Sequence, residues 1–334
     1  MKKVGIIGGA GYTGGEAARL LVNHPEVELA FVQSASSAGK LLSDVHADLL
    51  GDTTMRFSAE AVGEDGSSAA AGDVDVIVIC AGHGDARKWL EANPVAAGVK
   101  IVDLSQDFRL AATSTLGSRS FVYGLPEMNR ERIRAADSIA NPGCFATCLQ
   151  LGMLPLAAAG LLVDDVHVSA TTGSTGAGQK PTASTHFSWR ANNLSAYKAF
   201  GHQHLLEIGE SIVGLQPSFG GEILFVPCRG AFTRGIFATI YTRSDLSAAQ
   251  AVELYAEFYR DAAFTHVSDR AVDLKQVVNT NKCLVQVEKH GDKLLITSVI
   301  DNLLKGASGQ AVQNMNLMLG LDERAGLRLK AAAF

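Results

Sequence analysis

The stretch that decides the fold lies near the start of the chain and reads Val4-Gly5-Ile6-Ile7-Gly8-Gly9-Ala10-Gly11-Tyr12-Thr13-Gly14. The apolar run Val4–Ile7 leads into closely spaced glycines and then into Gly14–Val22, whose apolar residues recur at helical spacing. A strand, a tight glycine turn and a helix in this order let the backbone approach a pyrophosphate at a helix N-terminus. We therefore predict a dinucleotide-binding loop rather than a bare glycine-rich turn, with the cofactor contacted by Gly8, Gly11, Tyr12, Thr13 and Gly14.

Composition narrows the class of protein further. The chain has 334 residues, of which 47% are hydrophobic and 19% charged, which fits an ordinary globular protein of about two domains. The net charge is −5 and no basic tract or apolar run of about 20 residues occurs, so neither nucleic acid nor a membrane is an expected partner. Five cysteines spread over the chain suggest free thiols and a cytoplasmic location rather than a disulfide framework.

The first third of the chain alternates strand-like and helix-like segments. Apolar runs at Leu29–Gln33, Val74–Cys80 and Ile101–Leu104 read as strands, and Asp85–Ala92 reads as a helix. Short apolar strands separated by helices predict a parallel βαβ sheet. This part is therefore expected to be a Rossmann-type domain.

The pattern changes after Asn141-Pro142-Gly143. A long helix is expected over Cys144–Ala158 and an amphipathic one over Ala248–Tyr259, and the segment Lys289–Lys293 between two apolar runs reads as a hairpin turn. The expected strands are Val166–Ala170, Ile223–Val226, Ile236–Tyr241, Cys283–Val287 and Leu294–Ile300. We predict an α/β protein in which a parallel-sheet cofactor domain (1–143 with 311–334) accompanies an α+β catalytic and oligomerisation domain (144–310) with a mixed, largely antiparallel sheet.

The end of the second expected strand bears on the choice of cofactor. The segment Gln33–Lys40 contains hydroxyls and a lysine but no carboxylate that could bind a ribose 2′-OH, which favours the 2′-phosphate of NADP(H) over NAD. A solvated serine-rich loop is the alternative reading. We assign Ser34 and Ser36 to this phosphate, and Gly82, in the turn Ala81-Gly82-His83-Gly84, to the nicotinamide side.

One cysteine has the setting of a nucleophile. Cys144 opens a helix, where partial positive charge and free N–H groups stabilise a thiolate, although most single cysteines are small buried hydrophobes. Cys148 is expected to pack one turn further along the helix, and Cys80, Cys228 and Cys283 to lie in the core.

The histidine pair His202 and His204 supplies candidates for acid/base catalysis, because imidazole titrates near neutral pH. A structural role remains open for the pair. No third ligand lies at useful spacing, so no metal is expected.

Eight motifs occur in a fixed order along the chain, and they are distributed from residue 8 to residue 311. They are Gly8–Gly14, Asp103–Leu110, Tyr123–Glu127, Asn141–Thr147, Gly173–Gly178, His202–His204, Thr233–Ile236 and Asp301–Ala311. In this combination the chain resembles the N-acetyl-gamma-glutamyl-phosphate reductase family, whose broader relatives are the aspartate-semialdehyde dehydrogenases.

The resemblance implies NADPH-dependent reduction of N-acetyl-L-glutamyl 5-phosphate to the semialdehyde and phosphate through a cysteine thioester, in arginine biosynthesis. It implies that Cys144 is the nucleophile and His202 the acid/base, with His204 as the alternative, and that the protein is a homodimer or homotetramer. Substrate contacts are assigned to Arg109, Asn141, Ser174 and His204, and further cofactor contacts to Gly176 and Asn302. Gly306 and Gln310 are expected close to the nicotinamide or the substrate.

The chain departs from the family's common pattern at four places. Phe145-Ala146 replaces the usual Tyr-Pro after the cysteine, and Cys228-Arg229 stands where His-Leu is common. Gln203 replaces a basic residue between the histidines, and Leu205-Leu206-Glu207-Ile208 follows in place of the usual Pro-Glu-Ile. The last two differences leave the acyl group open, so an N-succinyl, aspartyl or aminoadipyl phosphate is an alternative substrate. A non-catalytic NADP-binding regulator is the alternative of a different class.

Overall fold

The computed structural model describes residues 1–61 and 74–332. The chain forms two units: unit 1 comprises Met1–Pro142 and Ala307–Arg328, and unit 2 comprises Gly143–Gly306 and the residues from Leu329 onward. The sequence predicts a first domain of 1–143 with 311–334, whereas Gly143 and the residues from Leu329 onward belong to unit 2 and 307–310 belong to unit 1. Residues 333–334 lie outside the described residues.

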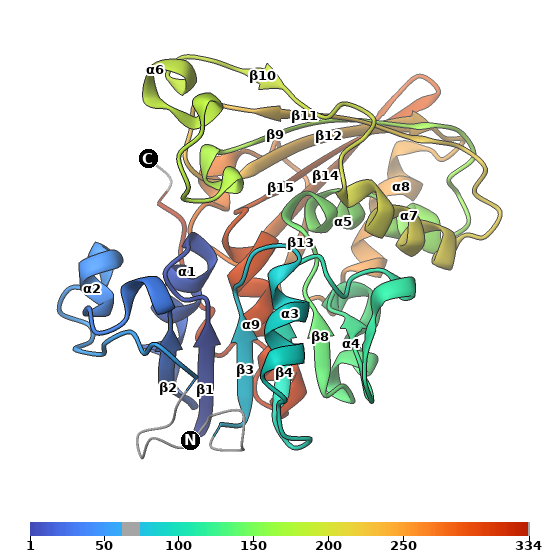
Figure 1. The fold of residues 1–334 in the computed structure, drawn as a ribbon. Coiled ribbons are helices and arrows are strands. Elements are labelled where there is room, and N and C mark those ends of the chain that lie inside the picture. Colours follow the sequence, from blue (N-terminus) through green and yellow to red (C-terminus); the bar gives the residue numbers. More distant parts are fainter. Residues whose placement is uncertain (62–73, 333–334) are drawn as a thin grey trace. The chain divides into compact units, whose positions relative to one another are not determined.

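Unit 1 contains a six-stranded parallel sheet in the order β2-β1-β3-β4-β8-β7 (Figure 1). Its strands are β1 (Lys2–Ile7), β2 (Val27–Gln33), β3 (Val76–Ile79), β4 (Lys100–Asp103), β7 (Val122–Tyr123) and β8 (Ser138–Ala140), with β5 (Thr115–Leu116) and β6 (Arg119–Ser120) as a separate pair. Its helices are α1 (Tyr12–Leu21), α2 (Leu42–Val45), α3 (Asp85–Ala92), α4 (Pro126–Arg134) and α9 (Gly309–Leu319). The predicted Rossmann-type parallel sheet is thereby confirmed.

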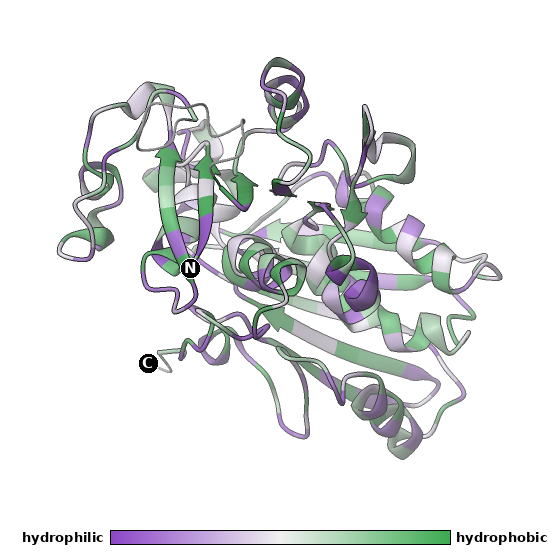
Figure 2. Cartoon of the chain, turned by 90° about the horizontal axis from the view of Figure 1, so that it is seen from below, coloured by the Kyte–Doolittle hydropathy of each residue, from purple (hydrophilic) through white to green (hydrophobic). Residues whose placement is uncertain are grey.

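The sheet of unit 1 is buried on both faces, as expected for parallel strands covered by helices. All four residues of β3 are buried. Ile77 and Ile79 pack in one cluster with Ala86 and Leu90 of α3, whereas α9 packs against β4, α1 and α4. Figure 2 shows the strands beside the N-terminus turning from hydrophilic to hydrophobic along their length, since β1 begins with two exposed lysines.

Unit 2 is built around a seven-stranded sheet in the order β10-β11-β9-β12-β15-β14-β13. The strands are β9 (Val166–Thr172), β10 (Ser195–Ala196), β11 (Ile223–Arg229), β12 (Ile236–Arg243), β13 (Thr265–Ser268), β14 (Cys283–His290) and β15 (Lys293–Ile300). The pairs β9–β11 and β13–β14 are parallel and the other four are antiparallel, so the predicted mixed sheet is confirmed. The predicted hairpin is also present, with Gly291-Asp292 as its two-residue turn.

Three helices, α5 (Cys144–Ala158), α7 (His204–Leu215) and α8 (Ala248–Phe258), lie together under this sheet, and the short α6 (Phe187–Arg190) lies near β10 (Figure 1). Helix α5 contains Pro155, which has no N–H to donate to the carbonyl of Leu151 one turn earlier. The hydroxyl of Tyr259 donates to that carbonyl at 2.6 Å. This bond lets α5 continue through the proline, over the bounds expected from the sequence.

The burial of the cysteines agrees with the prediction at two positions and differs from it at two others. Cys148 and Cys283 are buried as predicted, and the Cys148 Sγ lies 3.3 Å from the carbonyl oxygen of Ser298. Cys80 and Cys228 are only partly buried, because Cys80 follows the end of β3 and Cys228 lies near the end of β11. All five cysteines are free thiols.

Candidate active site

The glycine-rich loop lies between β1 and α1, and two of its glycines are required by the protein's own packing. Gly8 has a φ of 76°, and a Cβ there would lie 2.9 Å from the Cys80 carbonyl oxygen. A Cβ on Gly14 would lie 2.6 Å from the Cα of Gly9. In contrast, a Cβ on Gly11 would meet no atom within 4 Å, so packing within the described chain does not demand glycine there. The open space on this side of Gly11 suits a ligand that approaches the backbone closely.

Helix α1 begins directly after this loop, and the partial positive charge at its N-terminus is not offset by a capping side chain or an acidic residue in its first turn. Its N-cap residue, Gly11, provides no capping side chain, and its first turn contains no acidic residue. The positive end of the helix is therefore suited to an anion such as a pyrophosphate. Tyr12 and Thr13, both assigned to the cofactor, form this first turn.

The loops after β2 and β3 lie at the same edge of the sheet as the glycine loop. The N–H of Gly9 donates to the carbonyl of Gln33 at 2.8 Å, and Gly8 faces the backbone of Cys80. After β2, the hydroxyls of Ser34 and Ser36 lie 3.3 Å apart, and Ser34 is buried whereas Ser36 is exposed. The structure thus brings together the cofactor residues predicted around β1, β2 and β3, with Gly82 in the exposed turn after β3.

Arg109 and Asn141 are buried in unit 1 and bind the backbone. Arg109 donates from Nε to the Asn141 carbonyl and from Nη2 to the Leu104 carbonyl, both at 2.8 Å. The Asn141 amide donates to the Ala307 carbonyl at 3.0 Å and accepts from Asn314 at 3.0 Å. These contacts hold the segment that runs into Cys144, and the substrate contacts assigned to the two residues stay predictions.

Cys144 is the first residue of α5 and is partly exposed. The N-cap Gly143 provides no side chain and the first turn has no acidic residue, so the positive end of the helix acts on the thiol. The N–H of Gly143 donates to the Glu207 carboxylate at 3.1 Å, which holds the backbone just before the nucleophile. On another side, a Cβ on Gly306 would lie 2.9 Å from the Cys144 Cβ, so only glycine fits against the cysteine.

The histidine pair lies beside this helix start. The ring centroids of His202 and His204 are 4.7 Å apart, and the Phe145 ring contacts both edge-on, at 5.4 and 6.4 Å. A Cβ on Gly143 would lie 2.3 Å from the His204 Nε2, which is itself 3.9 Å from Glu207. Both histidines therefore lie against the residues that flank Cys144, and the geometry leaves the choice of acid/base between them open.

The charge state of His202 follows from its surroundings. Burial, and next the positive charges of Lys198 and Arg229, lower the pKa of His202 to about 4. The imidazole is therefore neutral at neutral pH and can accept a proton.

A second loop cluster in unit 2 contains Ser174, Gly176 and Asn302. Asn302 is buried, and its side chain accepts from the Gly235 N–H at 2.7 Å and donates to the Thr175 hydroxyl at 3.0 Å. Ser174 and Gly176 belong to the turn Ser174–Ala177, and a Cβ on Gly176 would lie 3.9 Å from the Asn302 amide nitrogen. Asn302 therefore holds this loop in place.

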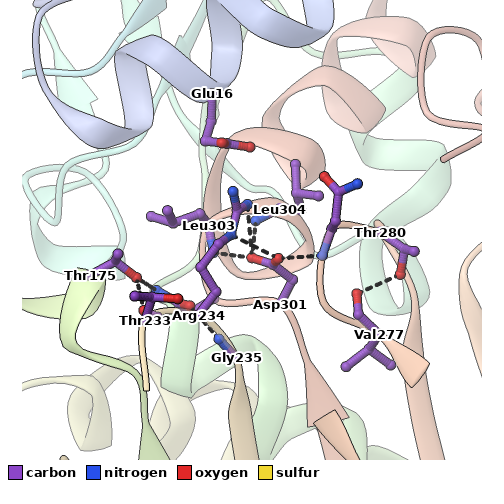
Figure 3. Close-up of polar contacts among 12 residues, drawn as sticks. Glu16, Thr175, Thr233, Arg234, Gly235, Val277, Thr280, Asp301, Leu303 and Leu304 are labelled. Atoms are coloured by element: carbon purple, nitrogen blue, oxygen red, sulfur yellow. Dashed lines mark hydrogen bonds and ion pairs between the residues drawn. The ribbon is translucent and has the colours of Figure 1, made fainter. Parts of the chain in front are cut away.

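Next to Asn302, Asp301 is fully buried and forms a two-point ion pair with Arg234, with N–O distances of 3.1 and 3.2 Å (Figure 3). Its carboxylate also accepts the N–H groups of Asn279, Leu303 and Leu304. The Asp301 carbonyl accepts the N–H of Gly306, the residue that packs on Cys144. Asp301 thus links Arg234 to the segment beside the nucleophile.

The sequence by itself predicts no role for Glu207, Arg234 or Asp301. Glu207 lies three residues after His204 on α7, a spacing that places both side chains on one face of a helix. Arg234 and Asp301 belong to two of the eight motifs, but 67 residues separate them, so their pairing depends on the tertiary fold.

Across 1–61 and 74–332, no group of three or more metal-ligating side chains is gathered in a way that could hold a metal ion. No helix in these same ranges is long and apolar enough to cross a bilayer.

Comparisons with known proteins agree with this arrangement. A family model for the semialdehyde dehydrogenase NAD binding domain matches residues 3–136, and one for the semialdehyde dehydrogenase dimerisation domain matches residues 144–302. Among solved structures, aspartate semialdehyde dehydrogenase II from Vibrio cholerae, complexed with ASA, superposes with a TM-score of 0.73 at 18% identity, covering 96% of this chain and 98% of that one. The Candida albicans aspartate semialdehyde dehydrogenase with NADP gives a TM-score of 0.68 at 17% identity and the same coverages. The chain therefore has the fold of the semialdehyde dehydrogenases and matches both of their domains.

Curated relatives narrow the family further. N-acetyl-gamma-glutamyl-phosphate reductases from Bacteroides fragilis and Christiangramia forsetii are 54% and 56% identical to this chain over 334 residues, which is the full length of both partners. The chain therefore belongs to the N-acetyl-gamma-glutamyl-phosphate reductase family. It is an oxidoreductase with a nicotinamide-dinucleotide-binding domain.

Proposed function

We propose that this chain reduces N-acetyl-L-glutamyl 5-phosphate to N-acetyl-L-glutamate 5-semialdehyde and phosphate, with NADPH as the reductant, in arginine biosynthesis. The observation that carries the proposal is the setting of Cys144 at the uncapped N-terminus of α5, where the next residue, Phe145, contacts the rings of His202 and His204. The full-length relatives with this activity in their names supply the substrate.

The chain's own residues suit each step of this reaction. His202, or His204 in its place, accepts the thiol proton, and the Cys144 thiolate attacks the acyl phosphate and expels phosphate to leave a thioester. N–H groups at the start of α5 stabilise the oxyanion that develops on the thioester carbonyl. Bound NADPH supplies the hydride for the thioester carbon. The C–S bond then breaks as the semialdehyde forms, and the imidazolium returns its proton to the released Cys144 thiolate.

The preference for NADPH rests on the loop after β2. This loop has no carboxylate to bind a ribose 2′-OH, and it presents the Ser34 and Ser36 hydroxyls with Lys40 nearby in sequence. The pyrophosphate would lie at the open side of Gly11 and the N-terminus of α1. These contacts, the place of Gly82 on the nicotinamide side, and the cofactor contacts of Gly176 and Asn302 are all part of the proposal.

The substitution Cys144→Ala tests the nucleophile. We expect it to lower reduction by more than about a thousandfold, because no thioester can form, while NADPH binding measured by fluorescence titration stays within about twofold. The Cys228→Ala variant is the matched control, since Cys228 is another partly exposed thiol, and it should keep its activity. Turnover near the wild-type rate in Cys144→Ala would contradict the mechanism.

The acyl group is tested by the reverse reaction. Purified protein with NADP and phosphate is offered N-acetyl-glutamate semialdehyde, N-succinyl-glutamate semialdehyde, aspartate semialdehyde and an aminoadipate-derived semialdehyde in parallel. The proposal expects the N-acetyl compound to give the highest kcat/KM. A higher value for another compound would identify that compound's acyl phosphate as the substrate instead.

The assembly is proposed to be a homodimer or homotetramer that works in the cytoplasm, where free thiols persist. Along β12, residues facing α5, such as Ile240, are buried, while alternate residues such as Tyr241 are partly exposed. Tyr241 stacks on His167 of β9 at 4.8 Å, which forms an aromatic patch on the other face of the sheet. This face is suited to pair with a second copy.

A further inference from the structure

Arg229 lies close enough to His202 to act on its charge, and no role for this arginine follows from the sequence or from the relatives' names. It is the last residue of β11, and its guanidinium carbon lies 4.6 Å from the centroid of the Tyr197 ring. The Tyr197 ring in turn contacts the His202 ring at 5.8 Å, and His202 contacts Phe145, the residue after Cys144. Arg229 is therefore linked through Tyr197 and His202 to Phe145, the residue that follows the nucleophile.

The backbone of Arg229 is fixed independently of its side chain. Ser195 of β10 pairs with Arg229 in the sheet, and the buried Arg190 donates to the Arg229 carbonyl at 2.5 Å. Stacking on Tyr197 limits the guanidinium further. A cation held in this way is preorganised for a ligand, since little conformational entropy remains to be lost on binding.

The charge of Arg229 is not balanced within the described chain. Its buried Nε has no hydrogen-bond partner, and no carboxylate of residues 1–61 or 74–332 forms an ion pair with it. The nearby Lys198 adds a second positive charge and is held by Gln203, whose Oε1 accepts from the lysine Nζ at 3.0 Å. Gln203 lies between the two histidines, so the glutamine that replaces the usual basic residue ties Lys198 to the site.

The electrostatics of the neighbours agree with this picture. Both cations contribute to the low pKa of His202, after burial. The pKa of the Tyr197 hydroxyl is raised to about 12, mainly by burial, with Arg229 opposing the shift and Cys144 adding to it. Tyr197 therefore lies within electrostatic reach of both the thiol and the guanidinium.

We propose that Arg229, stacked on Tyr197 and assisted by Lys198, forms a carboxylate-binding subsite beside Cys144. It would hold a carboxylate of the substrate while the acyl phosphate at the other end of the molecule meets the thiol. The inference rests on the proposed function, because an N-acylated glutamyl phosphate carries such a carboxylate. Two positions could supply it: the α-carboxylate, which every candidate substrate of the glutamyl type has, or the terminal carboxylate of an N-succinyl group.

Binding of stable analogues separates these sources. Calorimetry compares wild type with Arg229→Gln for N-acetyl-L-glutamate, N-succinyl-L-glutamate and 4-acetamidobutyrate, which lacks the α-carboxylate. An α-carboxylate ligand predicts that the variant loses about 10- to 100-fold in affinity for both glutamates and almost none for 4-acetamidobutyrate. A succinyl carboxylate predicts a loss with N-succinyl-L-glutamate only. The control variant Arg270→Gln removes the charge of an exposed arginine of unit 2 and should bind all three compounds with wild-type affinity. Equal affinities of wild type and Arg229→Gln for all three compounds would overturn the proposal.

Alkylation of Cys144 provides a readout that needs no substrate. Iodoacetate carries a carboxylate and iodoacetamide is its neutral counterpart, so their rate ratio at Cys144 reports a cation near the thiol. We expect Arg229→Gln to lower this ratio about tenfold while the iodoacetamide rate changes less than twofold, and Arg229→Lys to recover part of it. An unchanged ratio would also overturn the proposal. If the analogues and the ratio respond to Arg229 but no semialdehyde is formed or consumed, the subsite stands and the proposed reaction fails.

Discussion

His202 shows how burial sets chemistry at the scale of one residue. The ring is buried between Phe145, Tyr197 and Phe225, and two cations lie nearby. Both effects disfavour the imidazolium. A neutral imidazole can serve as a base toward the thiol at physiological pH, and an anionic substrate that offsets Lys198 and Arg229 would favour its protonation later in the cycle.

The low pKa of His202 predicts a pH dependence of stability. Between the ordinary pKa of 6.5 and about 4, the unfolded chain binds a proton that the folded chain does not, so the free energy of unfolding falls as the pH drops through this range. In His202→Gln we expect urea unfolding at pH 5 and pH 7 to show a smaller fall, by on the order of 1 kcal/mol. The fall is not abolished, because burial also lowers the pKa of His24. The substitution His290→Gln changes an exposed histidine and serves as the control. An equal fall in the free energy of unfolding for wild type and His202→Gln would contradict the assignment.

At the scale of elements, the glycines in the turn between β1 and α1 are of two kinds: some are required by the fold, and one leaves space for a ligand. Gly8 and Gly14 are demanded by backbone geometry and packing, whereas Gly11 faces open space. The three glycines are equivalent in the sequence pattern. The atoms that surround each of them in the folded chain show which ones the packing requires.

This difference predicts opposite effects for two alanine substitutions. Gly11→Ala should leave the melting temperature within about 1 °C but weaken NADPH binding at least tenfold, because its Cβ would occupy the space reserved for the cofactor. Gly8→Ala should lower the free energy of unfolding by about 1 to 3 kcal/mol, through its positive φ and the contact with the Cys80 carbonyl. Thermal melts and NADPH titrations measure both. Wild-type NADPH affinity in Gly11→Ala would exclude this loop as the pyrophosphate site.

At the scale of the whole molecule, the sheet of unit 2 carries an aromatic patch on the face opposite to helix α5. Helix α5 packs closely under β12, since a Cβ on Gly152 would lie 2.4 Å from Ile240. The opposite side of the strand carries Tyr241, which is 42% exposed and stacked on His167. A patch of this kind is typical of an interface between copies.

The proposed assembly predicts the effect of a charge placed in this patch. We expect wild type to elute as a dimer or tetramer in size exclusion with light scattering, and Tyr241→Glu to shift toward monomer, because two copies would bury like charges. Val163→Glu changes another exposed apolar residue of unit 2 and should leave the assembly intact. A monomeric wild type would contradict the proposed oligomer, and an unchanged assembly in Tyr241→Glu would place the interface elsewhere.

The sequence by itself determined the elements and the class of protein. Strand and helix periodicity are local properties, so the bounds of α3 and α5 were predicted to the residue, and the ordered motifs identified the family that the relatives confirm. Cys144 was singled out because its place at a helix start is also local.

The tertiary structure alone decided which side chains meet. Glu207 reaches the N–H of Gly143 across 64 residues, Arg234 reaches Asp301 across 67, and Tyr259 satisfies the carbonyl exposed by Pro155. The different burial of Cys80 and Cys283 likewise depends on where their strands end and what covers them. Such pairings depend on how the strands and helices fold back on one another. A local sequence pattern does not specify which residues, distant in the sequence, will be close in space. The cluster of Arg229, Tyr197 and His202 is of the same kind, because β11 and the segment before α7 meet only in the folded chain.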